Sequence, residues 1–151
     1  MTSLVRRYLK TAIGFLVVGL MLGGWMMTGR ELAGRTPSAY VVSAHTHAIL
    51  VGFVMMMILG VALWMFPRPS RGDARYRPAV AEAAYWLIAV GTLARVVGEL
   101  VRTQSDALWL RTAVLATGSM QIVGLLLFFA TMWARIRPTG SQSREAAGER
   151  F

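Results

Sequence analysis

The sequence predicts an all-α integral membrane protein, a bundle of four transmembrane helices with both termini in the cytoplasm. The chain has 151 residues, of which 56% are hydrophobic and 15% charged, whereas soluble domains carry about a quarter charged residues. Long apolar stretches alternate with short connectors that are rich in arginine, which is typical of membrane-spanning chains. Eleven of the Lys and Arg residues fall on the side of the two termini and four on the other side, and this asymmetry predicts the orientation.

The four apolar runs are expected to be helices within one transmembrane domain, residues 1–136. A helix of roughly 20 residues crosses a hydrocarbon core of about 30 Å, and each run is long enough to do so. The first run follows a basic segment, as a signal peptide does, but its length and its lack of a cleavage motif favour a retained helix. Residues 137–151 are small, polar and charged, so we expect a disordered cytoplasmic tail. The predicted helices lie at about 9–29, 38–66, 79–102 and 108–136.

The formal net charge of +9 rests almost wholly on arginine. In a membrane protein such clusters indicate topology and contact with lipid head groups, so we expect the bilayer as a partner and no nucleic acid. The sequence contains no cysteine. This absence excludes disulfides, thiolate metal sites, iron–sulfur ligation and covalent c-type heme attachment.

The two histidines of the chain, His45 and His47, lie near the start of the second predicted helix. A histidine inside a bilayer needs a partner, and the candidates are a metal ion or a heme iron. Residues i and i+2 of a regular helix point about 200° apart, so the two side chains cannot bind one ion. Gly52 follows His45 by seven residues on the same face, which would leave room for a flat porphyrin. The pattern therefore favours His45 as an iron ligand and gives His47 a second site, or a purely hydrogen-bonding role.

Arginines of the third and fourth predicted helices are expected at the depth of these histidines. Arg95, Glu99 and Arg102 are spaced i, i+4, i+7 and share one face, and Arg111 joins the same layer. Two interpretations stay open. Arg95 could form an ion pair with Glu99 while Arg102 and Arg111 reach the head groups. Alternatively, Arg95, Arg102 and Arg111 could hold the propionates of a heme. Gln121 is a lone polar residue that could donate an interhelical hydrogen bond.

The stretch His45-Thr46-x-Ala48-x-x-x-Gly52-Phe53 resembles the second helix of the catalytic subunit of heme-copper oxidases, most closely the C-family oxidases and the nitric oxide reductases. In that family the histidine is an axial ligand of the low-spin heme b, a role that the resemblance carries over to His45 alone. His47 stands where the family has asparagine, so its role is not inherited. The chain is also similar, over about residues 10–137, to short subunit I-like proteins and to the NnrS family of heme- and copper-containing membrane proteins. These share a His-x-His-x-x-x-x-Gly-Phe start and an Arg-bearing third helix.

The resemblance implies a b-type heme protein of the bacterial inner (plasma) membrane that transfers electrons or binds a diatomic gas, NO or O₂. The family's other heme ligands and its three copper-binding histidines come from helices that this chain lacks. It therefore cannot alone assemble a heme-copper centre, and any enzymatic role would be oxidoreductase-like. A second axial ligand would be His45 of another copy, His47 of a neighbour or a methionine, and otherwise the iron would stay open to gas. We expect a homodimer or a larger membrane complex. The alternative function is a non-catalytic accessory subunit of a respiratory or nitrogen-oxide complex, or a copper-handling protein.

Overall fold

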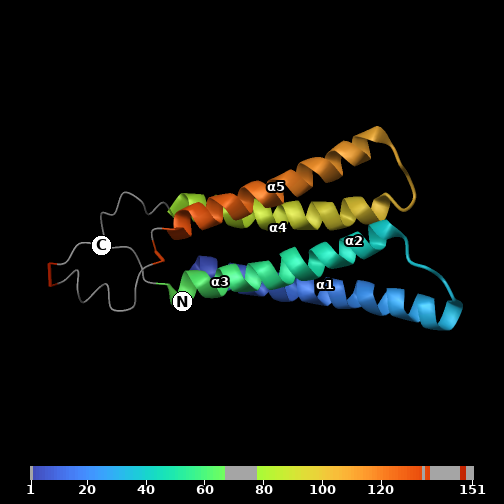
Figure 1. Cartoon of the computed structure of the whole chain (residues 1–151), viewed down its shortest axis with the longest axis horizontal. Coiled ribbons are helices and arrows are strands. Elements are labelled where there is room, and N and C mark those ends of the chain that lie inside the picture. Colours follow the sequence, from blue (N-terminus) through green and yellow to red (C-terminus); the bar gives the residue numbers. More distant parts are fainter. Residues whose placement is uncertain (1, 67–77, 134, 137–146, 149–151) are drawn as a thin grey trace.

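The computed structural model describes residues 2–66, 78–133, 135–136 and 147–148, and every regular element within those ranges is a helix. Four continuous helices there are long and apolar enough to span a membrane. The first and second form one hairpin and the third and fourth form another (Figure 1). This confirms the predicted all-α membrane architecture with four spans. The elements are α1 (Ser3–Ala33), α2 (Ala39–His47), η1 (Ala48–Met55), α3 (Met56–Met65), α4 (Pro78–Val101) and α5 (Leu108–Trp133).

The hairpin of α1 and α2 has well-defined helix ends. The Thr2 hydroxyl caps α1 by accepting a hydrogen bond from the backbone N–H of Val5, as N-cap residues do. Gly34 ends α1 in the left-handed region, at φ +59°, and its N–H donates to the carbonyl of Arg30. Ser38 caps α2 in the same way as Thr2 caps α1. Between these caps α1 is longer at both ends than the expected 9–29.

The second span is one continuous helix from Ala39 to Met65, but its middle is π-helical. The residues Ala48–Met55, directly after His47, form η1, and α3 continues from Met56. We expected a regular helix with 3.6 residues per turn over this segment. A π-helical turn is wider and is found mostly as short insertions, often at functional sites. The periodicity of a regular helix therefore does not determine which neighbour each residue after His47 faces.

The four helices pack together at the end of the bundle that holds the start of α1. Large side chains from all four spans are buried in one cluster there, which includes Tyr8, Met56, Ile88 and Phe128. The buried Arg135 follows α5 and donates to the carbonyls of Leu63 and Phe66 at the end of α3. We call the end of the bundle with the start of α1 and the end of α5 the terminal end. The opposite end, with residues 34–38 and 102–107, is the loop end.

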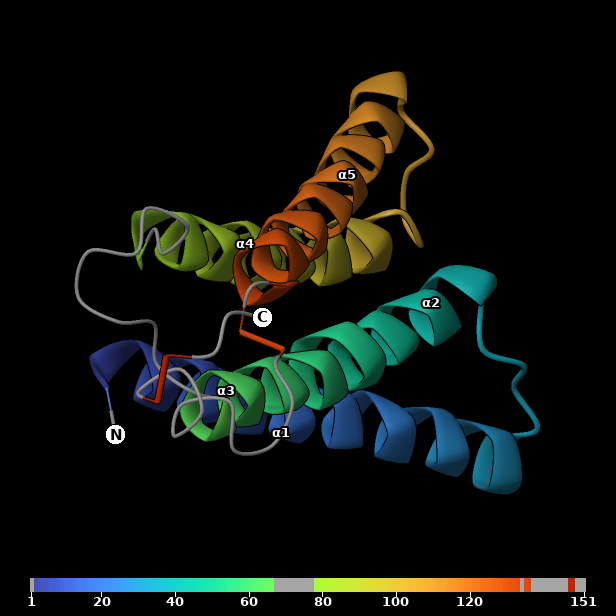
Figure 2. The ribbon, with the colours of Figure 1, turned by 60° about the vertical axis from the view of Figure 1, so that its left-hand side comes forward.

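Helix packing is looser towards the loop end. In both ribbon views the distance between α5 and α4 increases towards residues 102–107 (Figures 1 and 2). The α5 side chains of Leu108, Trp109 and Leu115 are exposed there. In this half Ala44 of α2 and Ala48 of η1 pack directly on Val96 of α4. The two histidines thus lie where the second span packs between α1 and α4.

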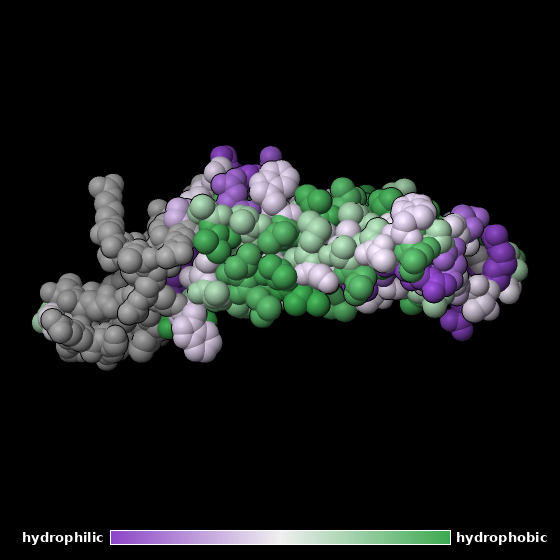
Figure 3. All heavy atoms as spheres, turned by 90° about the horizontal axis from the view of Figure 1, so that it is seen from above, coloured by the Kyte–Doolittle hydropathy of each residue, from purple (hydrophilic) through white to green (hydrophobic). Residues whose placement is uncertain are grey.

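The surface fits a bilayer. Hydrophobic residues cover the middle of the face drawn in Figure 3, and hydrophilic residues gather towards both ends. Exposed apolar side chains occur on every span, among them Leu20, Leu50, Val97 and Leu126. Contact with lipid explains so much exposed apolar surface, which a soluble monomer rarely shows. The predicted tail, 137–151, lies outside the described residues except for 147–148, and so do residues 67–77 between the second and third spans.

Candidate functional site

His45 points from α2 towards α1. Its Nδ1 lies 2.9 Å from the carbonyl oxygen of Gly19. A carbonyl oxygen can only accept a hydrogen bond, so Nδ1 carries a proton, and in the neutral form of the ring the lone pair is then on Nε2. One turn further along α1, a Cβ at Gly23 would lie 3.0 Å from His45 Cε1. We call the Gly19 carbonyl and the bare Cα of Gly23 the glycine cradle of His45.

Gly52 also faces α1, so the expectation that it shares a face with His45 is confirmed by their common neighbour. The space beside Gly52 is not open, however. A Cβ there would overlap the ring and the Cβ of Phe15, which is itself buried. Gly52 therefore allows close packing of two helices, and the room for a porphyrin that the sequence suggested at this glycine is taken by Phe15.

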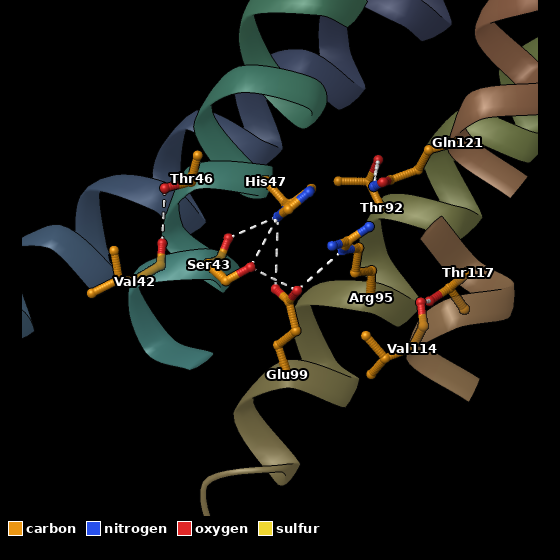
Figure 4. Close-up of polar contacts among 10 residues, drawn as sticks. All are labelled: Val42, Ser43, Thr46, His47, Thr92, Arg95, Glu99, Val114, Thr117 and Gln121. Atoms are coloured by element: carbon orange, nitrogen blue, oxygen red, sulfur yellow. Dashed lines mark hydrogen bonds and ion pairs between the residues drawn. The ribbon is translucent and has the colours of Figure 1, made fainter. Parts of the chain in front are cut away.

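His47 points to the other side of the second span, towards α4 (Figure 4). Its Nδ1 lies 2.9 Å from the carbonyl oxygen of Ser43 and 3.4 Å from the Ser43 hydroxyl. The same nitrogen is 3.8 Å from Oε2 of Glu99. As at His45, the bond to a carbonyl puts the proton on Nδ1 and the lone pair on Nε2. The prediction that the two histidines face different partners is confirmed.

Glu99 is the centre of a buried polar cluster. Its side chain is 4% exposed, and its Oε1 accepts from the Ser43 hydroxyl at 2.8 Å and from Arg95 Nε at 3.1 Å. Its Oε2 is buried without a hydrogen-bond partner. The ion pair between Arg95 and Glu99, one part of the first interpretation of this helix face, is present. We call Ser43, His47, Arg95 and Glu99 the polar cluster (Figure 4).

The other two arginines of the predicted layer lie at the loop end. Arg102 donates to the Tyr40 hydroxyl and to Asp106, and its guanidinium stacks on the Tyr40 ring. Arg111 donates to the same Asp106. Hydrogen bonds from Arg111 and Arg102 lower the pKa of Asp106 to about 2. In the described part of the chain no hydrogen bond or ion pair connects Arg95, Arg102 or Arg111 to His45.

The sequence analysis missed two residues: Ser43 of the polar cluster, and Asp106, which lies between α4 and α5 and binds Arg102 and Arg111. Ser43 precedes His47 by four residues, and this spacing could have indicated that both meet the same neighbour. Asp106 had no assigned role although it lies between two predicted arginines. Gln121 was expected to donate an interhelical hydrogen bond, and this is confirmed, because its Nε2 donates to the buried Thr92 hydroxyl at 3.0 Å.

The donor chemistry of the histidines fits a heme iron. A histidine ligand typically donates its other ring N–H to a carbonyl or carboxylate, which fixes the tautomer and the ring orientation. Both His45 and His47 hold Nδ1 in this way, and the lone pair on Nε2 remains for a metal. Among the described residues, no group of three or more His, Cys, Asp or Glu side chains could hold a metal ion. Heme, which brings four nitrogens of its own, demands fewer protein ligands than a bare ion.

Comparison with protein-family models matches residues 3–143 to the model described as cytochrome c and quinol oxidase polypeptide I. The match runs through all four spans and includes both histidines, the glycine cradle and the polar cluster. No curated protein and no solved structure gives a significant match.

Proposed function

The chain belongs to the family of cytochrome c and quinol oxidase polypeptide I, and on that premise we propose that it is a b-type heme-binding membrane protein with His45 as an iron ligand. The family as a whole uses heme and copper. The observation that carries the proposal is the Nδ1–H bond from His45 to the Gly19 carbonyl. It leaves Nε2 as the ring nitrogen for a metal within a bilayer-spanning helix, and a histidine Nε2 is a donor that binds heme iron.

When bound, the heme would supply a one-electron redox centre or a position for a diatomic gas such as NO or O₂. His45 would hold the iron. Of the predicted propionate partners, Arg95 is already paired with Glu99, whereas Arg102 and Arg111 share Asp106. We therefore propose that these arginines set the electrostatic surroundings of the heme and that their own carboxylate partners keep them in place.

The second ligand cannot be His47 of the same copy, because His47 faces α4 while His45 faces α1. We propose a homodimer or a larger membrane complex in which another copy or another chain completes the iron coordination, by a histidine or a methionine. An iron without such a ligand would stay open to gas. The positive charge near both termini supports an orientation with these ends in the cytoplasm, in the bacterial inner membrane.

The test is to express the full chain, to solubilise it in detergent and to record absorption spectra of the oxidised form, the dithionite-reduced form and the reduced form with carbon monoxide. We expect a Soret band with the α and β bands of a b-type heme on reduction. A spectral change with carbon monoxide would indicate an open position on the iron. A protein that stays colourless after heme is supplied during expression would contradict the proposal.

A second candidate is a non-catalytic accessory subunit, and one contact favours it. Phe15 fills the space at Gly52 that a porphyrin was expected to use. In this case the histidines would serve helix packing, His45 in the glycine cradle and His47 in the polar cluster, or would handle copper without a heme. The chain would then purify without heme but together with a larger oxidase or nitrogen-oxide complex, which pull-down from native membranes would detect.

A further inference from the structure

The four glycines at the centre of α1 do not have equal surroundings. A Cβ added at Gly14 or Gly24 would meet nothing within 4 Å. A Cβ added at Gly19 would overlap the Ile49 side chain, and at Gly23 it would press on the His45 ring. A side chain at Gly23 would therefore press on the His45 ring and one at Gly19 would displace the flexible end of Ile49, whereas the other two positions have room for it.

The contacts of Gly19 and Gly23 with His45 are of two kinds. The Gly19 carbonyl accepts the Nδ1 proton at 2.9 Å. The ring edge that carries Nδ1, Cε1 and Nε2 runs along Gly23, at 3.5, 3.0 and 3.8 Å from the position of a Cβ. A hydrogen bond and a flat contact surface together determine both the tautomer of an imidazole and its rotation about the side-chain bonds.

We propose that the glycine cradle positions His45 as an iron ligand, with the Gly19 carbonyl keeping the proton on Nδ1 and Gly23 setting the orientation of the ring. This inference rests on the proposed heme function. By this proposal α1 is part of the heme site, although α1 supplies no ligand to the iron. The Nδ1–H bond to a carbonyl also makes Nε2 a stronger donor, so the cradle would strengthen the bond between His45 and the iron.

The first experiment requires no heme and no change in the cradle. The full chain, labelled with ¹⁵N-histidine and held in detergent micelles at neutral pH, is measured by NMR, with His45→Ala and His47→Ala for assignment. We expect the signal of the tautomer whose proton is on Nδ1 of His45. A His45 signal from the Nε2–H tautomer would overturn the proposal, whatever the protein does with heme.

The second experiment compares Gly23→Ala with Gly24→Ala, its neighbour on the same helix. Both variants add one methyl group to α1, but only the methyl at position 23 reaches His45. We expect Gly23→Ala to bind heme about 10-fold more weakly, a typical loss when the support of a ligand is disturbed, and to shift the Soret maximum. Gly24→Ala is expected to match the unaltered protein in both measurements.

The two results distinguish the cradle from the proposed function. If the unaltered protein binds no heme, the proposed function fails, and the NMR measurement of the His45 tautomer in the unaltered protein and in Gly23→Ala still decides the cradle. If heme binds and Gly23→Ala matches Gly24→Ala in affinity, spectrum and tautomer, the cradle is wrong and the function stands. Circular dichroism and gel filtration establish that each variant is folded, and the NMR result on the unaltered protein holds even if Gly23→Ala is not.

Discussion

His45 and His47 lie two residues apart on one helix, and each has Nδ1 at 2.9 Å from a backbone carbonyl oxygen, yet the rest of their surroundings differs. The polar partner of His45 on α1 is a backbone carbonyl group, which carries no charge. His47 lies beside the Arg95–Glu99 ion pair of α4 and close to Ser43. A glycine contact controls where a ring points, whereas an ion pair controls the electrostatic field around it. The comparison indicates that His45 is held for its geometry and His47 for its charge environment.

The largest effect is expected on the His47 side, from Glu99→Ala. The substitution leaves the partly buried Arg95 without its carboxylate, and removal of one partner of a buried pair typically destabilises a protein by about 3–5 kcal/mol. Since a quarter of the Arg95 side chain is exposed, we expect up to about 3 kcal/mol. Denaturant unfolding in detergent measures the change in the free energy of unfolding.

The control for Glu99 is Glu31→Ala, which removes a carboxylate from an ion pair whose two side chains are both mostly exposed. Surface pairs contribute about 0–1 kcal/mol, so little change is expected. Equal effects of Glu99→Ala and Glu31→Ala would mean that the polar cluster does not stabilise the packing of α2 on α4.

The next effect is expected on the His45 side, from Gly52→Ala. The new Cβ would overlap Phe15, and overpacking of this kind costs about 1–3 kcal/mol. Gly14→Ala is the matched control, because nothing lies within 4 Å of its Cβ position; alanine also favours the helix by roughly 0.5–1 kcal/mol over glycine. The melting temperature should fall for Gly52→Ala and rise slightly for Gly14→Ala. A Gly52→Ala variant as stable as Gly14→Ala would show that the space at Gly52 is open after all.

A smaller effect is expected from pH at the loop end, near both histidines. The folded protein lowers the pKa of Asp106 from 3.8 to about 2 through its bonds to Arg111 and Arg102. Between these values the unfolded chain takes up a proton that the folded chain does not, so folding is less favoured as the pH falls. The contribution of Asp106 is complete above about pH 4 and is lost as the pH falls through about 2. Melting temperatures measured from pH 5 to pH 2 should fall less steeply for Asp106→Asn than for the unaltered protein.

The sequence was sufficient for the spans, the opposite facing of the histidines and the Arg95–Glu99 pair, because hydropathy and helical spacing determine these features locally. It did not predict η1, since an apolar run such as Ala48–Met55 looks the same in a regular helix and in a π-helix. It also suggested open space at Gly52, because a missing side chain indicates only that something comes close. That the neighbour is Phe15 of α1 depends on how the spans pack, which periodicity within one helix does not determine.

The most direct test of the account is the reduced-minus-oxidised absorption spectrum of the purified protein beside those of His45→Ala and His47→Ala. The account predicts a b-type heme spectrum in the unaltered protein and the loss of that heme in His45→Ala. His47→Ala should keep its heme, with a shift in midpoint potential at most, because the polar cluster acts through its charges. A heme that survives in His45→Ala with an unchanged Soret maximum, or that is lost only in His47→Ala, would contradict the assignment of His45 as the iron ligand.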